Sequence, residues 1–224
     1  MAILLSQSVF IHAPKTGGTW VAAALERSGL VIGDLGPVHA SPDELEREPA
    51  FRDRGNRFAF VRHPATWYAS AWAHRMDEKW GPINAPDWFS RAWTARWDEF
   101  TRRCNARLFP RFVENCTRAF PTGWLSAMYD AYTKGCTHIA RQETAADDLV
   151  AILRSIGEPL DEAAIRHTPP RNVRATSSRR ASRITFTPEI LEMIAAAEQQ
   201  AYLRFGYGLV PADNSSLPEQ PAAS

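Results

Sequence analysis

The chain has 224 residues, a formal net charge of +1 and 23% charged residues. This length is enough to bury the core of one domain. A charge this close to neutral creates no overall field for nucleic acid or an anionic membrane, so any anion site must be built locally. Neither a disulfide framework nor a zinc site is predicted, because the three cysteines lack paired ligand spacing.

The opening segment, MAILLSQSVF, has no basic residues before its short apolar run. It therefore predicts folded structure that runs directly into the next strand, and not a signal peptide. No apolar run approaches the roughly 18 residues that a membrane-spanning helix needs. We expect a cytoplasmic protein with no membrane span.

The strongest pattern is a buried strand over residues 9–11, a glycine loop, and a helix over residues 20–30. Main-chain N–H groups of such a loop can approach a phosphate, and the helix N-terminus adds partial positive charge. Lys15 adds a full charge, and it is one of only three lysines in a chain that otherwise uses arginine. This choice indicates a role for a compact ammonium group.

The loop reads PKTGGTW, with the lysine ahead of the glycines, whereas the common nucleotide-triphosphate loop places the lysine after them. It resembles the 5′-phosphosulfate loop of sulfotransferases, which use 3′-phosphoadenosine 5′-phosphosulfate (PAPS) as donor. The resemblance implies that the loop residues bind the donor: Lys15, Thr16, Gly17, Gly18, Thr19 and Trp20. A glycine turn with an exposed lysine is the alternative.

Residues 31–36 predict a turn, and a helix follows over residues 41–48 with Ser41 as its N-cap. His39 lies just ahead of this helix, where a surface or packing role is the simpler interpretation. The context GPVHASPDEL is similar to the segment that carries the general-base histidine of several carbohydrate sulfotransferases, with one extra residue before the histidine. The resemblance implies that His39 is the base, with Glu44 and His63 as the next candidates.

A second strand, turn and helix unit begins with a buried strand over residues 58–61. Arg62 ends this strand, and Ser70 follows eight positions later on the next helix. This spacing can bring a guanidinium fork and a hydroxyl onto one phosphate. The unit resembles the 3′-phosphate motif of sulfotransferases, which implies that Arg62 and Ser70 bind the donor's 3′-phosphate.

Tryptophans are dense between residues 67 and 112, where prolines separate short helical segments. The tryptophans of this segment are Trp67, Trp72, Trp80, Trp88, Trp93 and Trp97. We expect a Trp-rich helical insertion whose rings are mostly core; the alternative is that some line an acceptor pocket. Acidic residues interrupt the positive charge, so nucleic acid is not an expected partner.

The later pattern predicts a helix over residues 121–134, a strand over residues 137–140 and an amphipathic helix over residues 146–156 that Gly157 ends. Residues 163–188 contain six arginines and no acid, which is typical of a mobile basic loop. In sulfotransferases the equivalent loop folds over the nucleotide, which implies a donor contact by Arg174.

A final helix begins at Pro188, with Thr187 as its cap, and its apolar spacing continues to Phe205. We expect a disordered tail over residues 211–224. The resemblance covers residues 1–210 and implies a single P-loop-like α/β domain, with a central parallel sheet flanked by helices. Ligand loops are expected at the carboxyl ends of its strands.

The implied reaction transfers a sulfuryl group from PAPS to a hydroxyl or amine of a small-molecule or carbohydrate acceptor. It leaves 3′-phosphoadenosine 5′-phosphate (PAP) and needs no metal; Lys15 and His39 are the implied catalytic residues. One alternative is a P-loop-type small-molecule kinase, although no clear Mg²⁺-binding aspartate ends an apolar strand. The other is a non-catalytic nucleotide-binding member of the same fold.

Overall fold

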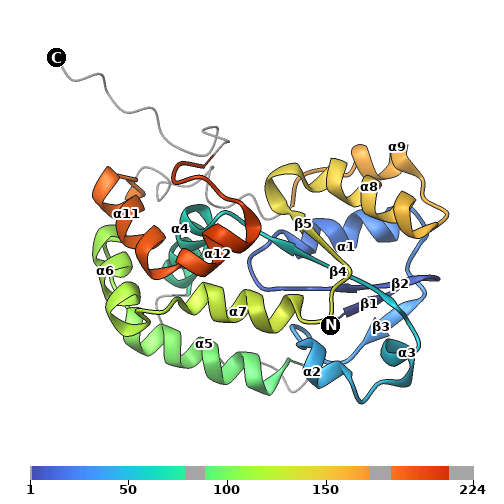
Figure 1. Cartoon of the computed structure of the whole chain (residues 1–224), viewed down its shortest axis with the longest axis horizontal. Helices are drawn as coiled ribbons and strands as arrows, with labels where there is room; N and C mark the ends of the chain where they lie inside the picture. The colour runs from blue at the N-terminus through green and yellow to red at the C-terminus, as the bar shows by residue number, and fades with distance from the viewer. Residues whose placement is uncertain (1, 79–88, 172–182, 212–224) are drawn as a thin grey trace. The chain divides into compact units, whose positions relative to one another are not determined.

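The computed structural model describes residues 2–78, 89–171 and 183–211 (Figure 1). The chain forms two compact units. The first unit comprises Met1–Arg62, Ile83–Asp98 and Ala127–Asn172. The second comprises His63–Pro82, Glu99–Ser126 and Val173–Ser224. That residues 1–210 behave as a single domain stays a prediction.

The first unit is built on a five-stranded sheet with the order β3-β1-β2-β4-β5. Its strands are β1 (Ala2–Leu4), β2 (Ser8–Ile11), β3 (Gly33–Leu35), β4 (Asn56–Val61) and β5 (His138–Arg141). β1 is antiparallel to both of its neighbours, whereas β2, β4 and β5 run parallel to one another. A mixed α/β fold with a mostly parallel central sheet flanked by helices is therefore confirmed.

Two local predictions near the N-terminus were wrong. The opening segment does not run straight into the loop strand; it forms β1 and a tight turn, in which the Leu5 N–H donates to the Ser8 carbonyl (2.9 Å). Residues 31–36 are not only a turn, because Gly33–Leu35 within them form β3, with Gly33 opposite Leu4 of β1. Pairing with β1 overrides the weak strand preference of glycine and aspartate at this edge.

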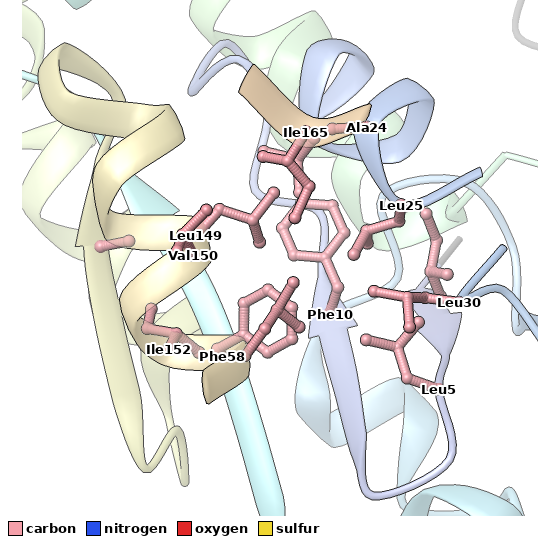
Figure 2. Close-up of a cluster of buried hydrophobic side chains, with 14 of the residues drawn as sticks. Leu5, Phe10, Ala24, Leu25, Leu30, Phe58, Leu149, Val150, Ile152 and Ile165 are labelled. Carbon is pink, nitrogen blue, oxygen red and sulfur yellow. The ribbon is translucent and has the colours of Figure 1, made fainter. Parts of the chain in front are cut away.

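One face of the sheet is covered by α1 (Gly18–Arg27), α8 (Ala145–Ile156) and α9 (Glu162–Arg166) (Figures 1 and 2). Phe10 of β2 lies at the centre of this core, with its ring centroid 5.4 Å from that of Phe58 and 6.1 Å from that of Phe60. Phe58 and Phe60 lie on the same face of the sheet, because side chains alternate between the two faces along a strand. Gly157 ends α8 with a φ of 85°, which confirms the predicted cap.

The short helices of the first unit are α2 (Pro42–Leu45), α3 (Pro49–Arg52) and the 3₁₀ turn η1 (Gln142–Thr144). Ser41 caps α2 as predicted, but this helix is only one turn long. The prediction of a basic loop was wrong at its start, residue 163, because Glu162–Arg166 form the helix α9. Residues 172–182 of that loop, Arg174 included, and the tail from residue 212 lie outside the described residues.

The second unit contains α4 (Pro64–Asp77), α6 (Phe109–Ala119), α11 (Pro188–Ala197) and α12 (Gln199–Phe205). The residues of α5 (Arg91–Cys104) and α7 (Trp124–Thr133) are divided between the units. Trp67, Trp72, Trp93 and Trp97 are buried, which confirms their predicted place in the core, while Trp80 and Trp88 lie outside the described ranges. That these helices form an insertion stays a prediction.

The predicted helix over residues 188–205 is interrupted at Glu198, whose side chain is fully buried. The carboxylate accepts hydrogen bonds from the Tyr68 hydroxyl (2.8 Å) and from the N–H groups of Leu125 (3.1 Å) and Ser126 (2.7 Å). Burial raises the pKa of Glu198, and these hydrogen-bond donors partly compensate for it. The carboxylate thus caps the first turn of α7, a role that helical spacing does not reveal.

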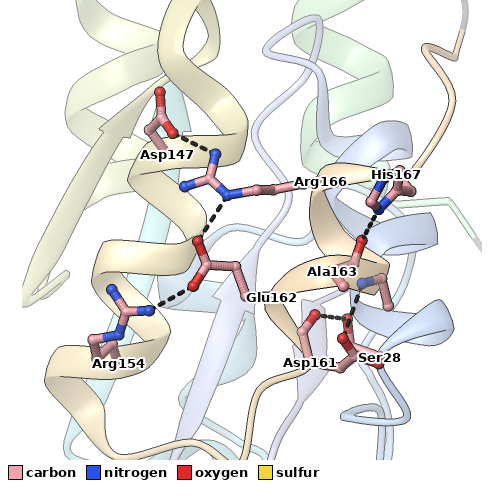
Figure 3. A network of polar contacts seen from close by, with 9 residues as sticks. Ser28, Asp147, Arg154, Asp161, Glu162, Ala163, Arg166 and His167 are labelled. Atoms are coloured by element: carbon pink, nitrogen blue, oxygen red, sulfur yellow. Dashed lines mark hydrogen bonds and ion pairs between the residues drawn. The ribbon is translucent and has the colours of Figure 1, made fainter.

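Glu158 has the same kind of role in the first unit. Its buried carboxylate accepts hydrogen bonds from the Ser6 hydroxyl (2.5 Å), the Gln7 N–H (2.8 Å) and the Ser8 hydroxyl (2.8 Å), which closes the β1–β2 turn. Figure 3 shows a contrasting exposed network, in which Glu162 binds Arg154 and Arg166 at 2.6 and 2.7 Å.

We expect Glu158→Ala to lower the free energy of unfolding by about 2 to 3 kcal/mol, because the donors of the β1–β2 turn lose their shared acceptor. Urea denaturation at pH 7 measures this change. Glu162→Ala is the matched control and should cost far less stability, since its ion pairs are exposed to solvent and screened by it. Equal losses in the two variants would contradict the structural role of Glu158.

Candidate functional site

The loop after β2 is a fixed turn that leads into α1. Thr16 is fully buried, and its hydroxyl donates to the Ala13 carbonyl (2.8 Å). Lys15 has a φ of 65°, in the left-handed region that residues other than glycine adopt rarely. Gly17 precedes α1 with a φ of 83°, and the first turn of α1 contains no acidic residue. The partial positive charge of this helix N-terminus is therefore not offset by a carboxylate of its own first turn.

Close packing requires both glycines of the loop. A Cβ atom on Gly18 would lie 1.9 Å from Cδ2 of His12, the residue directly after β2. A Cβ atom on Gly17 would lie 2.9 Å from Cγ of Gln142, the residue directly after β5. The residues that follow β2 and β5 therefore pack directly against the loop. The loop has room for them only because these two positions carry no side chain.

The loop, Arg62 and Gln142 leave the sheet at the same edge. β2, β4 and β5 are parallel, with Ile11 opposite Ala59 and Val61 opposite Arg141. Adjacent strands lie about 4.8 Å apart, so the segments that follow β2 and β4 begin as neighbours. The structure thereby places the Lys15 loop and Arg62 at one edge. Ser70 lies on α4 in the second unit, and its pairing with Arg62 stays a prediction.

The His39 side chain is oriented toward the start of the loop. Its Nδ1 lies 3.3 Å from the main-chain oxygen of His12, and the two imidazole centroids are 4.8 Å apart. A carbonyl oxygen only accepts, so Nδ1 carries the proton and Nε2 has the free lone pair. Phe89 and Trp93 also lie next to the ring, at centroid distances of 5.9 and 5.8 Å.

Burial keeps both imidazoles neutral. It lowers the pKa of His39 from 6.5 to about 4, and the nearby Lys15 ammonium acts in the same direction. Burial also lowers the pKa of His12 well below its usual value, with His39 as a further cause. Two residues that the sequence singled out as catalytic, Lys15 and His39, thus lie close enough to interact electrostatically. A neutral imidazole with a free Nε2 can accept a proton.

The two other candidate bases have structural roles. The Nδ1 atom of His63 accepts a main-chain N–H (3.2 Å), and its Nε2 donates to the Gly208 carbonyl (2.9 Å), so both ring nitrogens are engaged. The Glu44 carboxylate accepts hydrogen bonds from the Ser41 N–H (2.9 Å) and from the Ser90 hydroxyl (2.8 Å), which caps α2. Of the three candidates, His39 is the one whose geometry suits proton transfer.

Sequence reasoning missed His12 and Gln142. The available signal was position, because each directly follows the carboxyl end of a parallel strand. The Trp20 indole, expected to bind the donor, donates through Nε1 to the Thr168 carbonyl (3.1 Å). This bond joins α1 to the segment after α9. The donor contact expected of Trp20 stays a prediction.

The low pKa of His39 predicts that acid destabilises the protein. The unfolded chain protonates this residue near pH 6.5 and the folded chain only near pH 4, so the unfolded state binds more protons between these values. Stability is therefore complete above pH 6.5 and falls as pH drops toward 4, with a contribution from His39 on the order of 3 kcal/mol. His12 contributes in the same direction.

Urea denaturation at pH 7.5 and pH 5 measures this loss. His39→Asn, whose side chain tolerates the left-handed backbone, should remove part of the difference between the two pH values. His167→Asn changes an exposed histidine and should keep the full difference. An unchanged pH dependence in His39→Asn would contradict the assignment.

Comparisons of the chain with protein-family models, with curated protein sequences and with solved structures find no match. Within the described ranges, no group of three or more His, Cys, Asp or Glu side chains is arranged to hold a metal ion. No helix in this part of the chain is both long and apolar enough to cross a membrane.

Proposed function

We propose that this protein is a PAPS-dependent sulfotransferase with a P-loop-like donor site. The observation that carries the proposal is the shared sheet edge, from which the Lys15 loop and Arg62 extend on the neighbouring parallel strands β2 and β4. A doubly phosphorylated adenosine needs positive groups at two separate points, and two adjacent strand ends supply them. The neutral imidazole of His39 near Lys15 adds a proton acceptor.

The donor would be held by both positive groups. Lys15 and the main-chain N–H groups at the start of α1 would bind the 5′-phosphosulfate, where negative charge develops as PAP leaves. Arg62 would bind the 3′-phosphate through its planar fork, with Ser70 on α4 as the expected hydroxyl partner. The acceptor would be a small molecule or a carbohydrate, and its hydroxyl or amine would lie on the His39 side of the loop.

The transfer would be an in-line displacement at sulfur, comparable to phosphoryl transfer. The acceptor atom forms a bond to sulfur as the bond between sulfur and the phosphate oxygen of PAP breaks. Nε2 of His39 takes the proton of the acceptor, and the electron pair of the broken bond leaves with PAP. An anionic donor beside His39 would raise its pKa from about 4 toward the working pH, which makes it a better base.

The kinase alternative requires a carboxylate near the loop to hold Mg²⁺. β4, the parallel neighbour of β2, is followed by Arg62 and not by an aspartate. An arginine at this position favours recognition of a second phosphate over metal binding. The non-catalytic alternative shares the donor site and differs only in the absence of transfer.

Calorimetry separates the donors. The wild type should bind PAP more tightly than ATP with Mg²⁺, and Lys15→Asn should weaken PAP binding by about 10-fold or more, because a charge-assisted bond is lost. Asparagine tolerates the left-handed backbone of this position. Lys134→Asn is the control, since Lys134 is an exposed lysine that pairs with Asp43, and it should bind PAP normally. Tighter binding of ATP with Mg²⁺ would favour the kinase.

Transfer from radiolabelled PAPS to a panel of sugars, phenols, lipids and natural-product alcohols tests catalysis. His39→Asn should lower kcat by about 100-fold or more while PAP affinity changes less than about 2-fold, because a general base acts on the chemical step. An unchanged pH dependence of the rate in this variant would exclude His39 as the base. Donor binding without transfer to any member of the panel would favour the non-catalytic alternative.

A further inference from the structure

Two tyrosines of α7 hold the main chain of two residues on which the proposed function depends. Tyr129 and Tyr132 are three positions apart, so their side chains extend from the same face of the helix. Both are buried, with exposed fractions of 0% and 3%. They belong to the first unit, as do the residues that they contact.

The Tyr129 hydroxyl bonds both main-chain polar groups of Arg62. It accepts a hydrogen bond from the Arg62 N–H (2.9 Å) and donates one to the Arg62 carbonyl (2.7 Å). β4 ends one residue earlier, at Val61, so the hydroxyl takes the place that a partner strand would have in a continued ladder. The peptide groups on either side of Arg62 cannot rotate without breaking one of these bonds. The origin of the guanidinium stem is thereby held against the sheet edge.

The Tyr132 hydroxyl holds the residue proposed as the base. It donates to the His39 carbonyl at 2.6 Å. His39 has a φ of 58°, a conformation that persists in a residue other than glycine only when its surroundings hold it. Burial raises the pKa of Tyr132, so its hydroxyl stays protonated and remains a donor at working pH.

We propose that α7 aligns the two ends of the site through these hydroxyls, with Tyr129 positioning Arg62 for the 3′-phosphate and Tyr132 positioning His39 as the base. This inference rests on the proposed function. Both tyrosines are positioning residues, because they act through the main chain of another residue. Their roles are separate, so each can be removed while the other is kept.

Affinity for two nucleotides measures the role of Tyr129. PAP carries the 3′-phosphate and adenosine 5′-monophosphate lacks it, so the dissociation constant of adenosine 5′-monophosphate divided by that of PAP reports on the 3′-phosphate contact alone. Tyr129→Phe should reduce this ratio by about 10-fold, mainly through weaker PAP binding. Tyr132→Phe, a matched loss of one buried hydroxyl on the same helix, should leave the ratio within about 2-fold of the wild type.

The imidazole signals of His39 measure the role of Tyr132. In an NMR titration, assigned with His39→Asn, Tyr132→Phe should raise the pKa of His39 by about half a unit or more as the ring gains access to water. Tyr129→Phe should leave this pKa unchanged. Each variant should thus change one measurement and leave the other unchanged. A general loss of stability would not produce this pattern.

A wild-type ratio in Tyr129→Phe, or equal reductions in both variants, would overturn the inference and leave the proposed function intact. The double variant Arg62→Gln, Tyr129→Phe should have the same ratio as Arg62→Gln alone. A further reduction in the double variant would also overturn the inference. A wild-type protein that binds PAP no better than adenosine 5′-monophosphate would instead contradict the proposed function itself.

Should Tyr129→Phe not fold, hydrogen exchange of the wild type supplies the test. The Arg62 amide should exchange slowly, because the Tyr129 hydroxyl accepts its hydrogen bond, and should become slower still when PAP is added. Exchange at the rate of an unprotected amide would overturn the role of Tyr129.

Discussion

The parallel pairing of β2 with β4 is the constraint on which the candidate site depends. Because the two strands run the same way, the segments that follow them emerge at one edge of the sheet. Lys15 and Arg62 therefore begin from neighbouring points, although they are 47 positions apart in the chain. Antiparallel pairing would have sent the two segments to opposite edges, and no choice of side chains could then have joined them in one site.

Burial sets the electrostatics at this edge. His12 and His39 lie against each other, and burial in the folded protein lowers the pKa of both imidazoles and keeps them neutral, with Lys15 as a further cause at His39. The positive charge is thus concentrated where an anion would bind, and the lone pair of His39 remains available. The cost is a pair of poorly solvated rings that favour protonation in the unfolded chain, so the same feature that suits proton transfer makes the fold sensitive to acid.

Acids that are fully or partly buried support the framework around the site. Glu158 closes the β1–β2 turn, Glu198 caps α7 in the second unit, and Glu44 caps α2 next to His39. Each carboxylate accepts main-chain N–H groups that would otherwise lack partners at a turn or a helix end. In the first unit, α7 contributes its tyrosine hydroxyls in a comparable way, as it bonds main-chain groups of Arg62 and His39 beyond the end of regular structure.

The sequence by itself determined the elements with strong local signals: the strand and glycine loop around Lys15, the strand before Arg62, and the helix that Gly157 ends. Apolar runs, glycine and proline act over a few residues, so a single chain segment reveals them. Only the tertiary structure decided the strand order, the pairing of Gly33–Leu35 with β1, and the contacts of Gln142 and the α7 tyrosines. These depend on pairing and packing between segments far apart in the chain, which no local pattern encodes.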